Sequence, residues 1–225
     1  MTTLAFDVYG TLIDTAGVVT RLSNLVGERA GAFSQLWRDK QLEYSFRRGL
    51  MRQYQNFAVC TKNALDYTCR RFEVDFSEAD KEQLMSTYRV LPPFPDVESS
   101  LSKLKTASYR MFAFSNGRAD DVKNLLRNAK IENYFEDVVS VDEIKTFKPD
   151  PAVYELFLKR SGSAGQRAWL ISGNPFDVIG ALAVGMRAAW LRRSSQSFFD
   201  PWEFNPTVEI TSLTELHDSI HRHGS

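Results

Sequence analysis

Short apolar runs alternate with amphipathic segments along the C-terminal part of the chain. The runs with the length and flanking residues of strands are Arg110–Phe114, Val138–Val141, Ala168–Ile171, Ala188–Leu191 and Glu209–Ile210. Helical spacing of apolar residues is found between them, at Val97–Lys105, Asp120–Asn128, Ala152–Arg160 and Val178–Val184. A further apolar run, Leu4–Phe6, is too short for a helix and is predicted to be a buried strand. This alternation predicts an α/β fold with a mostly parallel sheet between two layers of helices.

The strand pattern is absent between residues 16 and 91. Apolar residues recur there at helical spacing in Phe33–Arg48 and Phe57–Phe72, and Ser77 with Asp80 can form a capping box at the start of a third helix. Prolines at 92, 93 and 95 mark the end of this stretch. We therefore expect a core built from residues 1–15 and 92–225 and a helical domain, residues 16–91, inserted after the first strand.

Charge and composition exclude several classes of partner. The 28 Lys and Arg residues balance 28 Asp and Glu residues, so no basic surface for nucleic acid is expected. No signal peptide and no apolar run long enough to span a bilayer are visible, so we expect no membrane partner. Cys60 and Cys69 fall in one predicted helix, roughly 13 Å apart, which is too far for a disulfide. These features predict a cytoplasmic protein.

Polar side chains follow the predicted strands where each strand ends. Asp7 closes the first strand, with Gly10 and Thr11 in the turn behind it. The other groups are Ser115 with Asn116, Lys148, and Ser172 with Asn174 and Asp177. Because the carboxyl ends of parallel strands meet at one edge of a sheet, these groups are expected to converge. Taken alone, a strand-ending Asp is equally expected to cap a turn.

Asp7 is the candidate nucleophile. The histidines of the chain all lie in the C-terminal segment, at 217, 221 and 223, so a serine or cysteine nucleophile has no evident base. Lys148 can supply the cation that keeps a desolvated Asp7 ionised. The alternative for Lys148 is an ordinary surface lysine in a loop.

Several of these segments together resemble the haloacid dehalogenase superfamily. They are FDVYGTL at Phe6–Leu12, Ser115-Asn116-Gly117, Lys148-Pro149-Asp150 with Tyr154, and SGNPFD at Ser172–Asp177, in the order of the four superfamily motifs. The segment LWRDKQLEY at Leu36–Tyr44 is similar to the cap segment of L-2-haloacid dehalogenases. The resemblance covers nearly the whole chain and implies a Rossmann-like core with a helical cap.

The resemblance also implies a two-step hydrolysis of short L-2-haloalkanoic acids. Asp7 attacks C2 and expels halide with inversion, and water then hydrolyses the aspartyl ester to release a 2-hydroxy acid. Thr11 holds the nucleophile, Lys148 pairs with it, and Tyr154 lies near that lysine. The hydrolytic water is positioned by Ser172, Asn174 and Asp177, with Asp177 the best candidate for the base.

The resemblance assigns the remaining site residues to the substrate. The halide is surrounded by Arg38, Asn116 and Phe176. The substrate carboxylate is bound by Ser115, helped by backbone N–H groups of the loops at Tyr9 and Asn116. The apolar wall is lined by Leu42 and Phe57, for which plain helix packing is an equally open interpretation.

Two other functions remain open from the sequence. A Mg²⁺-dependent small-molecule phosphatase of the same superfamily needs a second Asp two residues after the nucleophile, where this chain has Tyr9. It also needs metal-binding acids in the last motif, where Gly173 takes the first position. Because a leaving halide needs neither a proton nor a metal, no metal and no cofactor are expected. The second alternative is a non-catalytic member that binds a small acid or a partner protein.

We also expect a homodimer. Dimers are usual in the family that the sequence resembles. In addition, aromatic residues of the inserted helices suggest more apolar surface than a small helical domain needs to bury. These residues are Phe33, Trp37, Tyr44 and Phe46. The alternative is a well-packed four-helix cap that needs no partner.

Overall fold

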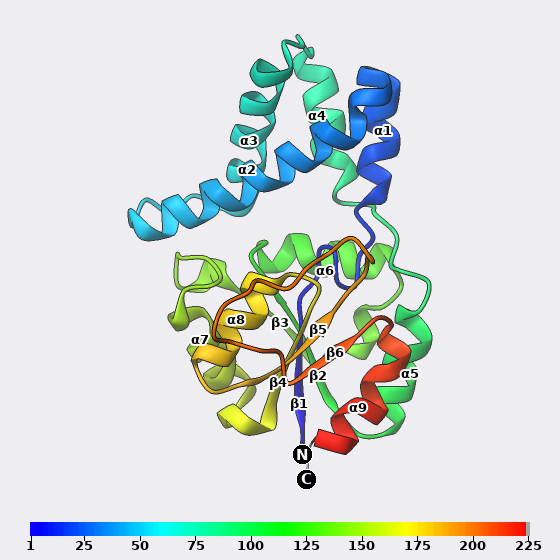
Figure 1. The fold of residues 1–225 in the computed structure, drawn as a ribbon, viewed down its shortest axis with the longest axis vertical. Helices are drawn as coiled ribbons and strands as arrows, with labels where there is room; N and C mark the ends of the chain where they lie inside the picture. The colour runs from blue at the N-terminus through cyan, green and yellow to red at the C-terminus, as the bar shows by residue number, and fades with distance from the viewer. Residues whose placement is uncertain (224–225) are drawn as a thin grey trace.

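A parallel β-sheet forms the centre of the computed structural model, which describes residues 1–223 (Figure 1). Its six strands lie in the order β3-β2-β1-β4-β5-β6, and every neighbouring pair is parallel. The strands are β1 (Thr3–Phe6), β2 (Arg110–Ser115), β3 (Asp137–Ser140), β4 (Ala168–Ser172), β5 (Arg187–Leu191) and β6 (Val208–Ile210). The order places β1, which is followed directly by Asp7, in the interior of the sheet.

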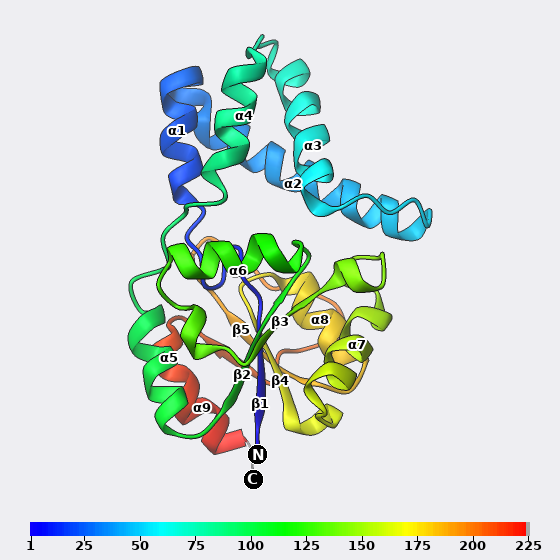
Figure 2. The same ribbon diagram turned by 180° about the vertical axis from the view of Figure 1, so that it is seen from behind.

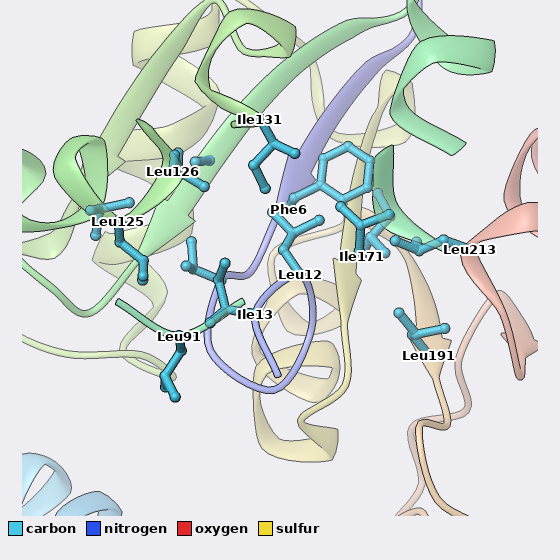
Figure 3. Close-up of a cluster of buried hydrophobic side chains, with 14 of the residues drawn as sticks. Phe6, Leu12, Ile13, Leu91, Leu125, Leu126, Ile131, Ile171, Leu191 and Leu213 are labelled. Atoms are coloured by element: carbon cyan, nitrogen blue, oxygen red, sulfur yellow. The ribbon is translucent and has the colours of Figure 1, made fainter. Parts of the chain in front are cut away.

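Helices cover both faces of this sheet (Figures 1 and 2). One face carries α5 (Val97–Thr106), α6 (Ala119–Asn128) and α9 (Leu216–His223), and the other carries α7 (Pro151–Ser161) and α8 (Pro175–Ala183). Side chains alternate along each strand, so Leu4 and Phe6 of β1 pack into the core on the α5 side, whereas Ala5 packs on the α7 side. Figure 3 shows part of the first core, with Phe6 beside Ile171 and Ile131. The predicted three-layer α/β architecture is confirmed.

Four helices separate β1 from α5. They are α1 (Ala16–Val26), α2 (Ala30–Leu50), α3 (Phe57–Phe72) and α4 (Glu78–Thr87), and they lie beyond the carboxyl ends of the strands (Figure 1). The predicted capping box of Ser77 and Asp80 is present at the start of α4. The chain segments that enter and leave this helical part are paired, since the N–H of Asp14 donates to the carbonyl of Pro92 and the N–H of Phe94 to that of Leu12, each at 2.9 Å.

One helix boundary near the strand ends differs from the prediction. We expected α8 to begin at Val178, but it begins at Pro175. Proline has the fixed φ and the missing N–H that suit the first helical position. Asp177 therefore lies in the first turn of α8 instead of in a loop, and the helix fixes its direction.

The aromatic residues that suggested a homodimer are packed within the chain. Phe33 and Trp37 are buried, Tyr44 contacts Tyr67, and Phe46 contacts Phe176 with ring centres 5.2 Å apart. Phe33 and Trp37 therefore contribute no surplus apolar surface, whereas Tyr44 and Phe46 remain half-buried. The dimer itself stays a prediction.

Two further predictions concern the cysteines and membrane-spanning segments. Cys60 and Cys69 both lie in α3, buried and unlinked. Among residues 1–223, no helix combines the length and the apolar character needed to cross a membrane.

Candidate active site

Asp7 stands directly after β1 and is held by the turn that follows it. Its backbone N–H donates to the carbonyl of Ile171 on the neighbouring strand, at 3.0 Å. Gly10 has a φ of +76°, which lets the chain reverse so that the Thr11 hydroxyl donates to Asp7 Oδ2 at 2.8 Å. The same Thr11 oxygen accepts from the N–H of Gly173 at 2.9 Å. The Asp7 side chain is only 12% exposed, and these contacts fix its orientation.

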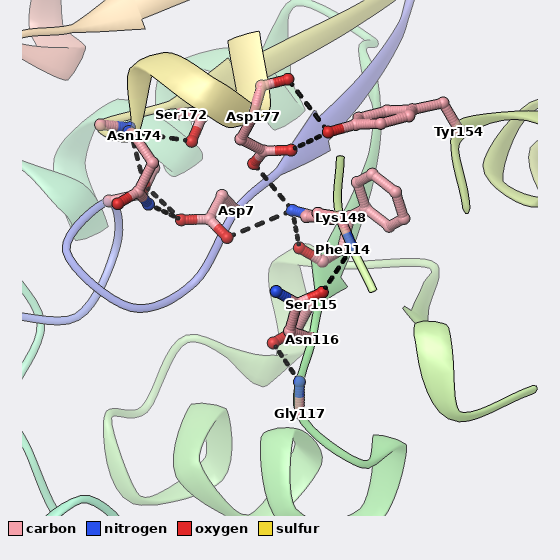
Figure 4. Close-up of polar contacts among 12 residues, drawn as sticks. Asp7, Phe114, Ser115, Asn116, Gly117, Lys148, Tyr154, Ser172, Asn174 and Asp177 are labelled. Carbon is pink, nitrogen blue, oxygen red and sulfur yellow. Dashed lines mark hydrogen bonds and ion pairs between the residues drawn. The ribbon is translucent and has the colours of Figure 1, made fainter. Parts of the chain in front are cut away.

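Lys148 is the cation of the site. Its ammonium lies 3.2 Å from Asp7 Oδ1, 2.8 Å from Asp177 Oδ2 and 2.9 Å from the carbonyl oxygen of Phe114 (Figure 4). The side chain is 1% exposed, so the interpretation as a surface lysine is excluded. A buried ammonium is tolerated only when its charge and its donors are satisfied, and two carboxylates and a carbonyl do this here. The backbone N–H of Lys148 donates to the Asn116 side chain at 3.0 Å, which fixes the loop.

Asp177 and Tyr154 lie behind the lysine, away from the nucleophile. The Tyr154 hydroxyl donates to Asp177 Oδ1 at 2.8 Å, and both side chains are fully buried. Burial raises the pKa of Asp177 and the charge of Asp7 raises it further; Lys148 and Tyr154 counteract only part of this, so the net shift is upward. Burial, followed by the charge of Asp177, holds the pKa of Tyr154 well above its usual value, so the phenol remains a donor.

Asn174 links the nucleophile to the inserted helices. Its amide nitrogen donates to Asp7 Oδ2 at 2.9 Å, and its amide oxygen accepts from Arg38 of α2 at 3.4 Å. Its backbone N–H donates to the hydroxyl of Ser172 at 3.1 Å. Arg38 is in turn held by Gln41, one helical turn further along α2, at 2.6 Å. The inserted helices thus bring a guanidinium to the ends of the strands.

A small cavity of about 20 Å³ lies against Asp7, with room for about one water molecule. Its walls are formed by Asp7, Tyr9, Arg38, Leu42, Phe57, Ser115, Asn116, Lys148, Asn174 and Phe176. The other predicted site residues lie behind this wall: Thr11, Ser172 and Asp177 are hydrogen-bonded to its members, and Tyr154 is hydrogen-bonded to Asp177. The structure therefore brings together every site residue that the sequence predicted. Asp177 itself does not reach the cavity, and its oxygens are occupied by Lys148 and Tyr154.

The residues present do not form a cage for a divalent cation. In residues 1–223, no group of three or more His, Cys, Asp or Glu residues has the arrangement of a metal site. The Lys148 ammonium occupies the space between the two carboxylates. The position of Gly173 also has no room for a carboxylate, because a Cβ there would lie 2.5 Å from the carbonyl oxygen of Gly10.

Two contributors were missed by sequence reasoning. Gln41 orients Arg38 and also donates to Thr61 at 2.5 Å; its signal was its place three residues after Arg38, on the same helix face. Gly180 lies under the Tyr154 ring, where a Cβ would be 2.3 Å from the phenol oxygen. A glycine inside an apolar helix carries no chemical signal, so sequence alone could not indicate it.

Comparison with known proteins places this geometry in a family. The model of the haloacid dehalogenase-like hydrolases matches residues 4–191. The chain belongs to the haloacid dehalogenase-like hydrolase family. The resemblance found in the sequence is thereby confirmed.

Among curated relatives and solved structures, the chain is similar to several dehalogenases. The chain is 37% identical to haloacetate dehalogenase H-2 of Moraxella sp. strain B, over 87% of each protein. It is 35% identical to the (S)-2-haloacid dehalogenase of Pseudomonas sp. strain YL, over 93% of this chain and 90% of that protein. An L-2-haloacid dehalogenase from Xanthobacter autotrophicus, solved with chloropropionic acid covalently bound, superposes with a TM-score of 0.91 at 29% identity, covering 99% and 98% of the two chains.

Proposed function

We propose that this protein hydrolyses short L-2-haloalkanoic acids to 2-hydroxy acids, with inversion at C2, through an ester on Asp7. One observation carries the proposal: a buried carboxylate, fixed by Thr11 and paired with Lys148, faces a small cavity that Arg38 also lines. The names of the relatives and the covalently bound neighbour support the same chemistry. In this proposal, residues 16–91 act as the cap over a catalytic core formed by residues 1–15 and 92–225.

The first step is a displacement at carbon. A carboxylate oxygen of Asp7 forms a bond to C2, and the electron pair of the carbon–halogen bond leaves with the halide. Arg38, Asn116 and Phe176 line the cavity and form the cradle for that halide. A fixed cation that meets charge developing in the transition state accelerates the step, because it need not reorganise.

Ser115 is the proposed ligand of the substrate carboxylate. Its hydroxyl oxygen accepts from the N–H of Gly117 at 3.0 Å, which leaves the hydroxyl proton free to be donated to an anion. Backbone N–H groups of the loops at Tyr9 and Asn116 complete this subsite. Leu42 and Phe57 supply the apolar wall against which the alkyl group packs.

The second step is hydrolysis of the ester. Water adds to the carboxyl carbon of Asp7, and the bond from that carbon to the ester oxygen on C2 breaks. The 2-hydroxy acid leaves with that oxygen and takes up one proton. Esterification removes the charge of Asp7, so Lys148 is then paired with Asp177 alone. We assign Asp177 the role of base, since its raised pKa makes it a stronger base than an ordinary Asp. The hydrolytic water must displace Lys148 or Tyr154 from an oxygen of Asp177 before it can donate a proton to that oxygen.

Metal-independent catalysis is part of the proposal. A phosphatase of this family would use a general acid at the position of Tyr9. Burial and the nearby charge of Asp121 raise the pKa of Tyr9 far above its usual value, which makes the phenol a poor acid. Together with the ammonium between the carboxylates, this favours halide over alcohol as the leaving group.

We also propose a homodimer in the cytoplasm. An exposed apolar surface supports the dimer. Leu50 and Met51 at the end of α2 are exposed, as is Trp202, and Leu50 and Trp202 border an apolar pocket of about 490 Å³. The support for the location is the pair of unlinked cysteines. Sedimentation velocity of the wild type and of Leu50→Glu tests the dimer: a monomer at every micromolar concentration for the wild type contradicts it.

Halide release from L-2-chloropropionate, measured with and without EDTA, tests the function. We expect release that EDTA does not reduce, formation of D-lactate, and no release from the D-substrate. A panel of phosphate esters is measured in parallel. Mg²⁺-dependent phosphate release without halide release contradicts the proposal in favour of a phosphatase. Binding of 2-hydroxy acids without turnover of either substrate class favours the non-catalytic alternative.

A further inference from the structure

Arg193, two residues beyond the end of β5, binds the turn that carries the nucleophile. Its Nη2 and Nε donate to the backbone carbonyl of Thr11 at 2.7 and 3.2 Å. Its Nη1 donates to both carboxylate oxygens of Asp96 at 2.8 and 2.7 Å. The guanidinium lies over the ring of Phe94, 4.1 Å from its centre, and the side chain is 15% exposed. These contacts use the planar fork of arginine, which lysine lacks.

Asp96 is itself held from two sides. It precedes α5, where the chain returns from the inserted helices, and it also accepts from the hydroxyl of Ser212 at 2.9 Å and the N–H of Leu213 at 2.8 Å. Burial acts to raise the pKa of Asp96, but Arg193 and the N–H of Leu213 outweigh it and the net shift is downward. The pair is therefore charged at neutral pH and anchored to the core.

Thr11 transmits this anchoring to the nucleophile. Its carbonyl is held by Arg193, while its hydroxyl donates to Asp7. Because the carbonyl and the hydroxyl belong to one residue, a displacement of the Thr11 backbone would also move the hydroxyl. The next residue, Leu12, accepts from the N–H of Phe94, so the returning segment is joined to the same turn.

We propose that Arg193 is a positioning residue for the displacement step: it fixes the turn at residues 10–13 through the Thr11 carbonyl and so fixes the direction of Asp7. With Asp96 it also joins the returning segment of the cap to that turn. This role rests on the proposed function, since the step that it serves is attack by Asp7. The competing explanation is an ion pair that only stabilises the fold.

Arg193→Lys and Arg193→Gln are the test variants. Lysine keeps the charge but cannot bind the carbonyl and both carboxylate oxygens together. Because misplacement of a reacting group by about 1 Å can cost on the order of 10²-fold in rate, we expect kcat for L-2-chloropropionate to fall roughly tenfold to a hundredfold in both variants. KM should change by less than about threefold, since no substrate contact is removed.

Arg110 provides a matched control. It also bridges a carboxylate, Glu136, and a backbone carbonyl, that of Ser161, and it lies over an aromatic ring, Phe112. It is at the opposite end of β2 from the site. Arg110→Gln should lower the melting temperature while kcat stays within about twofold of the wild type. Equal losses of kcat in the Arg110 and Arg193 variants would overturn the proposal.

A double-mutant cycle with Thr11→Val separates positioning from general destabilisation. If Arg193 acts through Thr11, Arg193→Gln should lower kcat by no more than about twofold once the Thr11 hydroxyl is absent. Independent effects that multiply would contradict the proposal.

Hydrogen exchange gives a readout that does not depend on activity. Arg193→Lys should speed amide exchange in the peptides covering residues 8–14 and 92–97 by several-fold, and Arg110→Gln should not. A wild type that releases no halide contradicts the proposed function alone, whereas unchanged exchange in these peptides contradicts the positioning role.

Discussion

The ammonium of Lys148 lies 0.4 Å closer to Asp177 than to Asp7, at 2.8 Å against 3.2 Å. The cation therefore retains a charged partner when Asp7 is converted to a neutral ester. In the proposed mechanism one lysine can therefore serve both steps: it pairs with the Asp7 carboxylate before attack and can stabilise the oxyanion that forms at the same carboxyl group afterwards.

Lys148→Met should abolish turnover and also weaken the fold. Removing the ammonium leaves two buried carboxylates facing each other, and breaking a buried pair of this kind typically costs about 3–5 kcal/mol. Urea unfolding and halide release measure the two effects. Lys145→Met, which removes a lysine exposed on the preceding loop, is the control and should leave both near wild type. A stable, active Lys148→Met variant would show that the pairing is not needed.

Arg38→Ala should lower kcat by about 10²-fold or more, the usual cost of losing one charge-assisted donor in a transition state. The melting temperature should change little, because no core contact is removed. Arg38→Lys should recover only part of the rate, since it loses the planar fork. Arg47→Ala, an exposed position on the same helix, is the control. Near wild-type kcat in a folded Arg38→Ala variant would mean that the halide is bound elsewhere.

Gly180→Ala should destabilise the fold by displacing Tyr154, which is hydrogen-bonded to Asp177. The added methyl group would lie 2.3 Å from the Tyr154 oxygen and must displace the ring. Overpacking of this kind costs typically 1–3 kcal/mol. Combining it with Tyr154→Leu removes the hydroxyl together with the ring carbons that the methyl group would meet at 2.6 and 2.7 Å, so Gly180→Ala should cost less stability, measured by urea unfolding, in that background than in the wild type. If the second change gives no recovery, the contact is not the cause of the destabilisation.

The acid limb of the pH–kcat profile should report Asp177. A base works only when deprotonated, and burial raises the pKa of Asp177, so kcat should fall at a pH above the ordinary range for an Asp. The Tyr154 hydrogen bond opposes this shift, so Tyr154→Phe should move the limb to still higher pH. A limb that does not move, or moves down, would exclude Asp177 as the titrating base.

The same raised pKa has a consequence for stability. A carboxyl whose pKa is higher in the folded state contributes stability at pH values below its unfolded pKa, and this contribution is lost as the pH rises through the folded pKa. Asp177→Asn should therefore reduce the loss of stability across that window, as followed by urea unfolding at several pH values.

The strand ends could be predicted because apolar runs locate the strands and a parallel sheet aligns their carboxyl ends. That logic placed Asp7 together with Lys148 and Asn174, although 141 and 167 positions of the sequence separate it from them. It did not place Asp177 in the first turn of α8, since the helix start depended on Pro175. It also gave no indication of Arg193, whose partner is a backbone carbonyl that no side-chain pattern encodes. Burial of Phe33 and Trp37 depended on how four helices pack, which spacing within one helix cannot decide.

A single turnover in H₂¹⁸O, with enzyme in excess over L-2-chloropropionate, tests most directly whether Asp7 forms the ester. The account predicts that one ¹⁸O enters the Asp7 carboxylate, because water attacks that carbon, and that the lactate carries unlabelled oxygen from Asp7. Mass spectrometry of the peptide containing Asp7 and of the product gives both quantities. Label in the lactate, with none on Asp7, would show that water attacks C2 directly and would contradict the covalent mechanism.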